Sequence, residues 1–265
     1  MSESNSNPDG QGIFALLSRA AAGEEITVRD DRCGLGALSD VAALDRRNGG
    51  RLRLVDTGRF GSAELEWLAS AGADIYTSDE TGRSAAELSL LVKSAARGGA
   101  FVAWFQYGPF DERAAEIALT GADLHVSDRE RPRDLEALAG LAYACRRAGA
   151  RLVYYHHGPA AAGLGGLAGN GGWIHLTAAS VPPGEGLGLL LDAARDAAAA
   201  GAGIVLHLDD DALEAAAVEE LMRAGAFVIF GRPHDYRSAF RELERRAARR
   251  RPGVRSYYLT ADFLP

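Results

Sequence analysis

The segment RLRLVDTGRF at residues 51–60 decides the fold, because three later segments repeat its pattern of a short apolar strand. They read FVAWFQYGPF at 101–110, RLVYYHHGPA at 151–160 and IVLHLDDDAL at 204–213. Each is followed by a second strand, DIYTSDE at 74–80, DLHVSDRE at 123–130, WIHLTAAS at 173–180 or FVIFGRPHD at 227–235. Helical sequences separate most of these strands, so each repeat of about fifty residues contains two βα steps. Four such βαβα repeats predict an α/β fold of the (βα)8 TIM-barrel type.

Extra segments stand at both ends of the four repeats. A helix-strand-helix pattern precedes them, and a short strand, SYYLT, follows. We therefore predict a disordered tail at 1–12, an N-terminal extension at 13–50, the barrel at 51–253 and a C-terminal extension at 254–265. The extensions are expected to plug the N-terminal face or to pair with a second subunit in a homo-oligomer. In an alternative frame the barrel begins at Ile26 and leaves the final βα unit outside, and only then do Asp30, Asp31 and Arg32 enter the site.

Composition favours a single barrel and excludes several partners. The chain has 265 residues and 47% hydrophobic residues, which fits a barrel of about 250 residues in one domain. A net charge of −7, with one basic run near the C-terminus, argues against nucleic-acid binding. The chain has no apolar run long enough to span a membrane, and its polar start resembles no signal peptide. We expect a cytoplasmic protein without a membrane partner.

The histidines suggest where a site would lie. Strand side chains alternate between the two faces of a sheet, so one parity of each barrel strand points to the barrel axis. In this frame the axial parity includes His125, His157, His175 and His207 from four consecutive strands, and Asp209 from the last of them. We predict that these five side chains converge at the C-terminal mouth of the barrel, where barrel enzymes carry out their chemistry.

Two kinds of chemistry suit these residues. Imidazole and carboxylate groups bind Zn, Mn or Fe, so His157, His175, His207 and Asp209 form a candidate site for one divalent metal ion. Without a metal, these groups and His125 would act as general acids and bases, because histidine titrates near neutrality.

Further residues are predicted to contact the substrate. Arg232, which follows a glycine at a strand tip, is suited to clamp a carboxylate or a phosphate. The segment from Gly158 to Gly172 contains seven glycines, which predicts a weak helix, a mobile lid or an anion-binding loop. The complete set of predicted substrate-binding residues is Arg232, Tyr107, Tyr155, Ser127, Thr177, Gly166 and Gly171. Asp79 and Asp128, just past two strands, are instead expected to cap the helices that follow them.

The predicted function is a barrel enzyme that acts on a small polar metabolite, for example a phosphorylated or carboxylated one. A hydrolase, lyase or isomerase fits metal-assisted or His/Asp acid–base chemistry. A Schiff base is excluded, because Lys93 is the only lysine and falls in a predicted outer helix. The alternative is a non-catalytic ligand-binding or assembly barrel whose polar axis is structural, since the sequence carries no complete catalytic motif.

Overall fold

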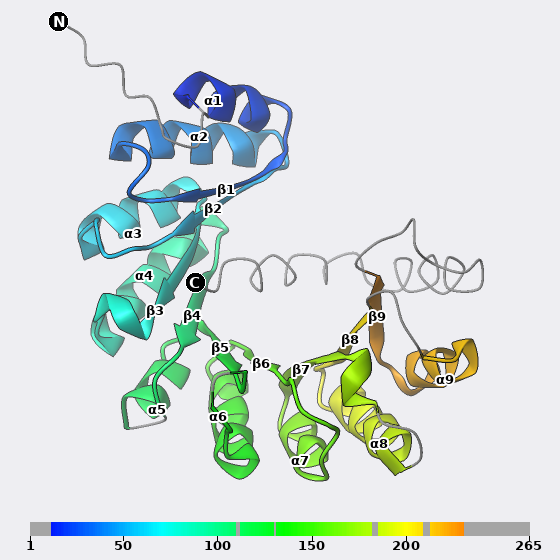
Figure 1. Cartoon of the computed structure of the whole chain (residues 1–265). Helices are drawn as coiled ribbons and strands as arrows, with labels where there is room; N and C mark the ends of the chain where they lie inside the picture. Colours follow the sequence, from blue (N-terminus) through cyan, green and yellow to red (C-terminus); the bar gives the residue numbers. More distant parts are fainter. Residues whose placement is uncertain (1–11, 110–111, 130, 182–184, 209–212, 231–265) are drawn as a thin grey trace, which may run out of the picture. The chain divides into compact units, whose positions relative to one another are not determined.

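A computed structural model describes residues 12–109, 112–129, 131–181, 185–208 and 213–230. Helices and strands alternate through these residues, from α1 in blue to β9 in orange (Figure 1). The chain divides into two compact units, and each is described by itself. Unit 1 comprises Met1–Val126 and Leu141–Leu152, and unit 2 comprises Ser127–Gly140 and Val153–Pro265.

Strands of unit 1 pair in parallel, in the order of the chain from β1 to β5. Its strands are β1 (Glu25–Arg29), β2 (Arg51–Val55), β3 (Asp74–Ser78), β4 (Val102–Gln106) and β5 (Asp123–Ser127). Its helices are α1 (Ile13–Ala21), α2 (Leu35–Arg47), α3 (Ser62–Ala71), the 3₁₀ turn η1 (Asp79–Thr81), α4 (Ala85–Gly98) and α5 (Glu112–Ala118). Helix α6 (Leu135–Arg147) contributes residues to both units.

Unit 2 has the same alternation, and its strands also follow each other in the sheet in chain order. Its strands are β6 (Leu152–Tyr155), β7 (Gly172–Thr177), β8 (Ile204–Leu208) and β9 (Phe227–Phe230). Its helices are α7 (Gly163–Gly169), the 3₁₀ turn η2 (Ala178–Ser180), α8 (Glu185–Ala199) and α9 (Ala215–Ala224). The predicted α/β class, with parallel strands alternating with helices, is confirmed.

All eight strands predicted from the four repeats are present, and β1 is a ninth. β1 pairs in parallel with β2 over five residues, from Glu25 opposite Arg51 to Arg29 opposite Val55. The N-terminal strand therefore extends the sheet, as in the alternative frame that begins at Ile26. The predicted C-terminal strand SYYLT lies outside the described residues.

Apolar alternation and close helix contacts explain the core. Leu52, Leu54 and Ile75, which share the parity predicted to face the helices, are fully buried.

Helix α4 begins at a capping box in which Ser84 accepts from the Glu87 main chain and the Glu87 side chain accepts from the Ser84 main chain. At its other end a Cβ on Gly98 would lie 1.9 Å from the Ala69 carbonyl oxygen, so only glycine lets α4 approach α3 this closely.

The glycine-rich segment forms the short helix α7. Leu164 and Leu167 are buried, which provides the apolar anchor for an intrinsically weak helix. Gly163 has a packing role, since a Cβ there would lie 2.8 Å from the Leu135 side chain of α6. Of the three predicted alternatives, a weak helix therefore describes Gly163–Gly169. None of the helices in the described residues has the length and apolar character that a membrane crossing requires.

Candidate functional site

Two of the predicted histidines contact each other in unit 2. His175 on β7 and His207 on β8 approach to 2.9 Å between Nδ1 of His175 and Nε2 of His207. Their ring centroids are 5.2 Å apart, and the ring of Tyr155 on β6 lies 4.8 Å from that of His175. Three adjoining strands thus place a row of rings on one face of the sheet, with the alternation that the sequence predicted.

The two imidazoles differ in their access to solvent. His175 is 3% exposed, whereas His207 is half-buried. Only one hydrogen fits between two ring nitrogens, so one ring donates and the other accepts. If His207 takes up a proton, its Nε2–H points at the Nδ1 lone pair of a neutral His175, which stabilises the cation. The more exposed ring therefore has a hydrogen-bond partner that supports both of its protonation states.

His157 lies elsewhere in unit 2, two residues past the end of β6, and its side chain is exposed. Its main-chain N–H donates to Oδ1 of Asp128 at 2.8 Å. Partial desolvation, together with the charges of Arg129 and His156, lowers the pKa of His157 in spite of the nearby Asp128 carboxylate. The ring is thus biased toward the neutral form, which is the form that accepts a proton.

His125 belongs to unit 1 and is 3% exposed. Its ring stacks on that of Phe105 at a centroid distance of 4.6 Å. Burial, with a smaller effect from the Arg151 charge, lowers the pKa of His125 to about 3. An imidazole with that pKa stays neutral at physiological pH. The structure therefore places His125 as a neutral ring stacked in the core.

The remaining predicted site residues are spread over several elements. Tyr107 stacks on Phe105 in unit 1, with 6.5 Å between the centroids, and the Ser127 hydroxyl accepts from the Arg129 main chain. Thr177 ends β7 opposite His207 in the register. Gly166 lies within α7, and Gly171 has a left-handed φ of 94°. Asp209 and Arg232 lie outside the described residues.

The predicted metal site is not assembled in the part of the chain that the structure describes. Within those residues, no group of three or more His, Cys, Asp or Glu side chains is arranged to hold a metal ion. Of the predicted ligands, His175 and His207 contact each other, and the His157 main chain binds Asp128 on the loop after β6. Asp209 lies outside the described residues.

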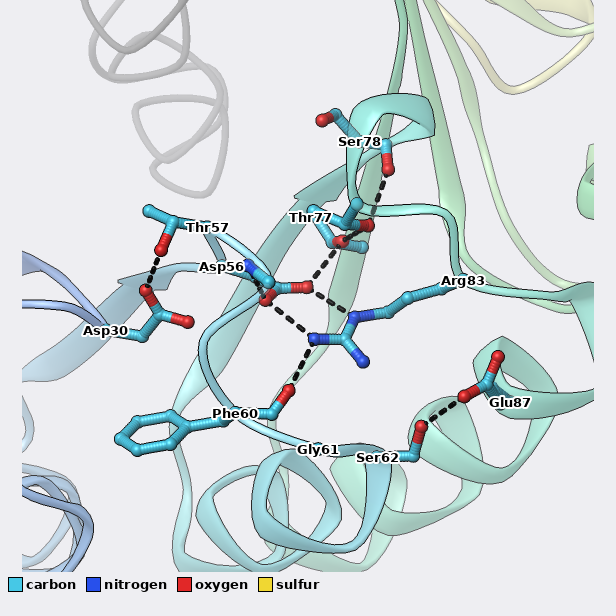
Figure 2. Close-up of polar contacts among 12 residues, drawn as sticks. Asp30, Asp56, Thr57, Phe60, Gly61, Ser62, Thr77, Ser78, Arg83 and Glu87 are labelled. Carbon is cyan, nitrogen blue, oxygen red and sulfur yellow. Dashed lines mark hydrogen bonds and ion pairs between the residues drawn. The ribbon is translucent and has the colours of Figure 1, made fainter.

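The structure reveals a buried ion pair in unit 1 that the sequence analysis did not predict. The Asp56 carboxylate, one residue past β2, binds the Arg83 guanidinium through both oxygens, with 2.7 Å between Nη2 and Oδ1 (Figure 2). Asp56 also accepts from the Thr77 hydroxyl at 2.7 Å and from the Gly58 main chain at 2.9 Å. Arg83 donates further to the Phe60 carbonyl oxygen at 3.0 Å, and its bonds to Asp56 raise its pKa. These contacts fix the loop after β2, and no local spacing predicts them because the partners are 27 residues apart.

Asp30, the residue of the alternative frame, lies beside this loop. Its side chain is fully buried, and Oδ1 accepts from the Thr57 hydroxyl at 2.5 Å (Figure 2). Its carbonyl oxygen accepts from Arg59 at 3.0 Å. Because β1 pairs with β2, Asp30 does join the polar groups at the strand ends of unit 1, as the frame beginning at Ile26 requires.

A second network that the sequence analysis missed joins Asp128, Tyr154 and His156 in unit 2. Oδ2 of Asp128 lies 2.6 Å from Nδ1 of His156 and accepts from the Tyr154 hydroxyl at 2.7 Å. The expectation that Asp128 caps the next helix is wrong, because Asp134 accepts from the first turn of α6, at 2.9 Å from the Glu136 nitrogen. Alternation assigns His156 to the helix-facing parity, where apolar side chains are expected. The adjacent histidines His156 and His157 at the end of this strand are the local sign of a polar site.

No family model matches the chain, and no curated protein matches it either. Solved structures with partial similarity include citrate synthase SbnG, with 11% identity, 88% of this chain and 96% of the other covered, and a TM-score of 0.36. The HpcH/HpaI aldolase from Desulfitobacterium hafniense DCB-2 has 13% identity, 91% and 90% coverage, and a TM-score of 0.34. A mutant tryptophan synthase alpha-subunit from Pyrococcus furiosus has 18% identity, 85% and 96% coverage, and a TM-score of 0.34. At such identities and TM-scores no function transfers to this chain.

Proposed function

We propose that this protein is an enzyme that moves protons to and from a small polar metabolite at the ends of β6, β7 and β8. His207 is the group that accepts and returns the proton, and His175 is its hydrogen-bond partner. The observation that carries this proposal is the 2.9 Å contact between Nδ1 of His175 and Nε2 of His207. A base whose other nitrogen is held by an oriented partner is the usual arrangement in acid–base catalysis.

The proposed chemistry follows from the positions of the nitrogens. Nε2 of His207 is engaged with His175, and we assign the proton transfer to Nδ1 of the same ring. When Nδ1 takes a proton from a carbon next to a carbonyl, the charge on His207 is shared with His175 through the hydrogen bond. The same nitrogen then returns a proton to the substrate, as a lyase or an isomerase requires. His157, with its lowered pKa, would supply a second neutral imidazole on the loop after β6.

Hydrogen exchange into metabolites tests this function without a known substrate. Pools of 2-oxo acids, hydroxy acids and sugar phosphates are incubated with the protein in D₂O, and deuterium incorporation is followed by mass spectrometry. We expect at least one compound to gain deuterium, and His207→Gln to lower that rate by at least about 100-fold. Glu219→Gln, which neutralises the carboxylate that pairs with Arg223 on α9, is the matched control and should keep the wild-type rate.

A non-catalytic binding protein is the second candidate, favoured by the Asp56–Arg83 cluster. Both carboxylate oxygens of Asp56 and the Nε and Nη2 groups of Arg83 already have protein partners, which is typical of a structural polar group. In that case the metabolite pools would raise the thermal midpoint without incorporating deuterium. Equal exchange rates in the wild type and in His207→Gln would also contradict the enzyme proposal.

A further inference from the structure

The loop after β6 carries His157, and both of its ends are fixed by one network. At the start of the loop, the His157 main-chain N–H donates to Oδ1 of Asp128 at 2.8 Å. At the end of the loop, the Pro159 carbonyl oxygen lies 2.9 Å from Nε2 of His156. Between them, a Cβ on Gly158 would lie 3.1 Å from Cε1 of His156, so the loop packs directly on that ring.

The partners of His156 define its protonation state. Nδ1 faces the Asp128 carboxylate at 2.6 Å, and Nε2 faces a carbonyl oxygen, and both of these partners only accept hydrogen bonds. Both ring nitrogens must therefore carry hydrogen, which makes His156 an imidazolium paired with Asp128. Consistently, although burial opposes it, the bonds to Asp128 and Pro159 raise the pKa of His156. The charged and titratable groups that act on this network are Asp128, Arg129, Arg133, Tyr154 and His157.

Unit 1 contains a counterpart of this network, in which a neutral glutamine takes the place of the histidine. There Nε2 of Gln106 donates to the Pro109 carbonyl oxygen at 3.2 Å, as His156 does to Pro159, three residues further along the chain in both cases. Trp104 donates to Gln106 at 3.1 Å, and Asp79 accepts from the Gly108 main chain at 2.7 Å. A glutamine together with a carboxylate thus holds this loop without an imidazolium. The charged pair in unit 2 adds desolvation cost, which calls for a role beyond loop closure.

We propose that Asp128 is a positioning residue for His157, because its carboxylate, held by the His156 imidazolium and the Tyr154 hydroxyl, fixes the main chain that presents the exposed His157 ring. This inference rests on the proposed function, in which His157 belongs to the proton-transfer site. The His156 cation also lies next to His157 in the chain and disfavours a second positive charge on that ring. The network thus fixes the place of the His157 imidazole, and desolvation of the ring, which outweighs the Asp128 charge, lowers its pKa.

Two readouts on Asp128→Asn test the proposal. The first is amide hydrogen exchange of the His157 N–H, which requires no catalysis, and we expect it to accelerate at least about tenfold when the charge-assisted bond is lost. The second is the kinetics of deuterium incorporation into the compound found with the metabolite pools. We expect kcat to fall by about 10- to 100-fold with KM unchanged, because a displaced catalytic group affects the transition state more than binding. Asp79→Asn, the matched change in unit 1, should leave kcat unchanged.

Tyr154→Phe provides a second variant if Asp128→Asn does not fold, since it removes one hydroxyl and keeps the ring. It should give smaller changes in the same directions. His156→Gln, which copies Gln106 of unit 1, should fold but should have a kcat below that of the wild type. Unchanged exchange at the His157 amide, or a wild-type kcat in a variant whose amide exchanges faster, would overturn the positioning role while leaving the proposed function intact. A wild-type protein that incorporates no deuterium into any compound would instead overturn the proposed function itself.

Discussion

Replacing Asp45 by asparagine is expected to stabilise the protein at neutral and alkaline pH. Asp45 lies on α2 with its side chain fully buried, and no hydrogen-bond partner for either carboxylate oxygen is found among the described residues. Burial, only partly offset by the Arg19 charge, raises its pKa to about 6 from an ordinary 3.8. The folded protein therefore binds this proton more tightly than the unfolded chain does.

The sign and size of the effect follow from this difference. Between pH 3.8 and about 6 the folded state holds more protons, so the free energy of unfolding falls as the pH rises through this window and stays low above it. A shift of about two pKa units corresponds to about 3 kcal/mol at most. Solvent screening reduces this value, and we expect Asp45→Asn to gain about 1–2 kcal/mol at pH 8.

Urea denaturation at pH 4 and at pH 8 measures this gain for the wild type and the variant. The stabilisation should be present at pH 8 and should nearly vanish at pH 4, where Asp45 is already protonated. Asp40→Asn on the same helix is the control, because Asp40 is exposed and its removal should change little at either pH. A variant that is less stable than the wild type at pH 8, or equally stabilised at both values, would refute the assignment of a buried, unfavourable charge.

Two further predictions concern the ion pair of Asp56 with Arg83 and the close contact of α3 with α4. Arg83→Met should cost about 3–5 kcal/mol of unfolding free energy, because it leaves the Asp56 carboxylate buried and unpaired, whereas the double variant with Asp56→Asn should recover part of the loss. Additive effects in that double-mutant cycle, measured by urea denaturation, would contradict the pairing. Gly98→Ala should lower the thermal midpoint because the new Cβ meets the Ala69 carbonyl oxygen, and Gly140→Ala in α6, which has nothing within 4 Å, should raise it. The same change in both variants would show that helix propensity and not the close contact decides the outcome.

Local patterning explains what the sequence predicted correctly. The alternation in strands such as RLRLV, and glycines at the helix ends, predicted the parallel strands and their helices, and they placed Tyr155, His175 and His207 on one face. These are short-range properties, set by the two-residue period of a strand. The repeat count favours a barrel that begins at Arg51 and leaves β1 outside, whereas the alternative frame that begins at Ile26 includes β1, and β1 does pair with β2.

Long-range pairing explains what the sequence did not predict. Asp56 and Arg83, and likewise Asp128 and His156, come together only when neighbouring strands have paired, and their separations of 27 and 28 residues carry no local signature. His156 was overlooked for a second reason. Its parity assigned it to the helix-facing side, where a buried imidazole is stable only because Asp128 and Pro159 both accept its hydrogens.

The hydrogen bond between His175 and His207 can be measured directly by ¹⁵N NMR of protein labelled in its histidine rings. A scalar coupling across the hydrogen bond should connect Nδ1 of His175 with Nε2 of His207, and it should disappear in His207→Gln, because the two nitrogens share one hydrogen. Histidine rings that show no such coupling, and whose signals are unaffected by substitution of the other, would contradict the proton-transfer centre proposed for this protein.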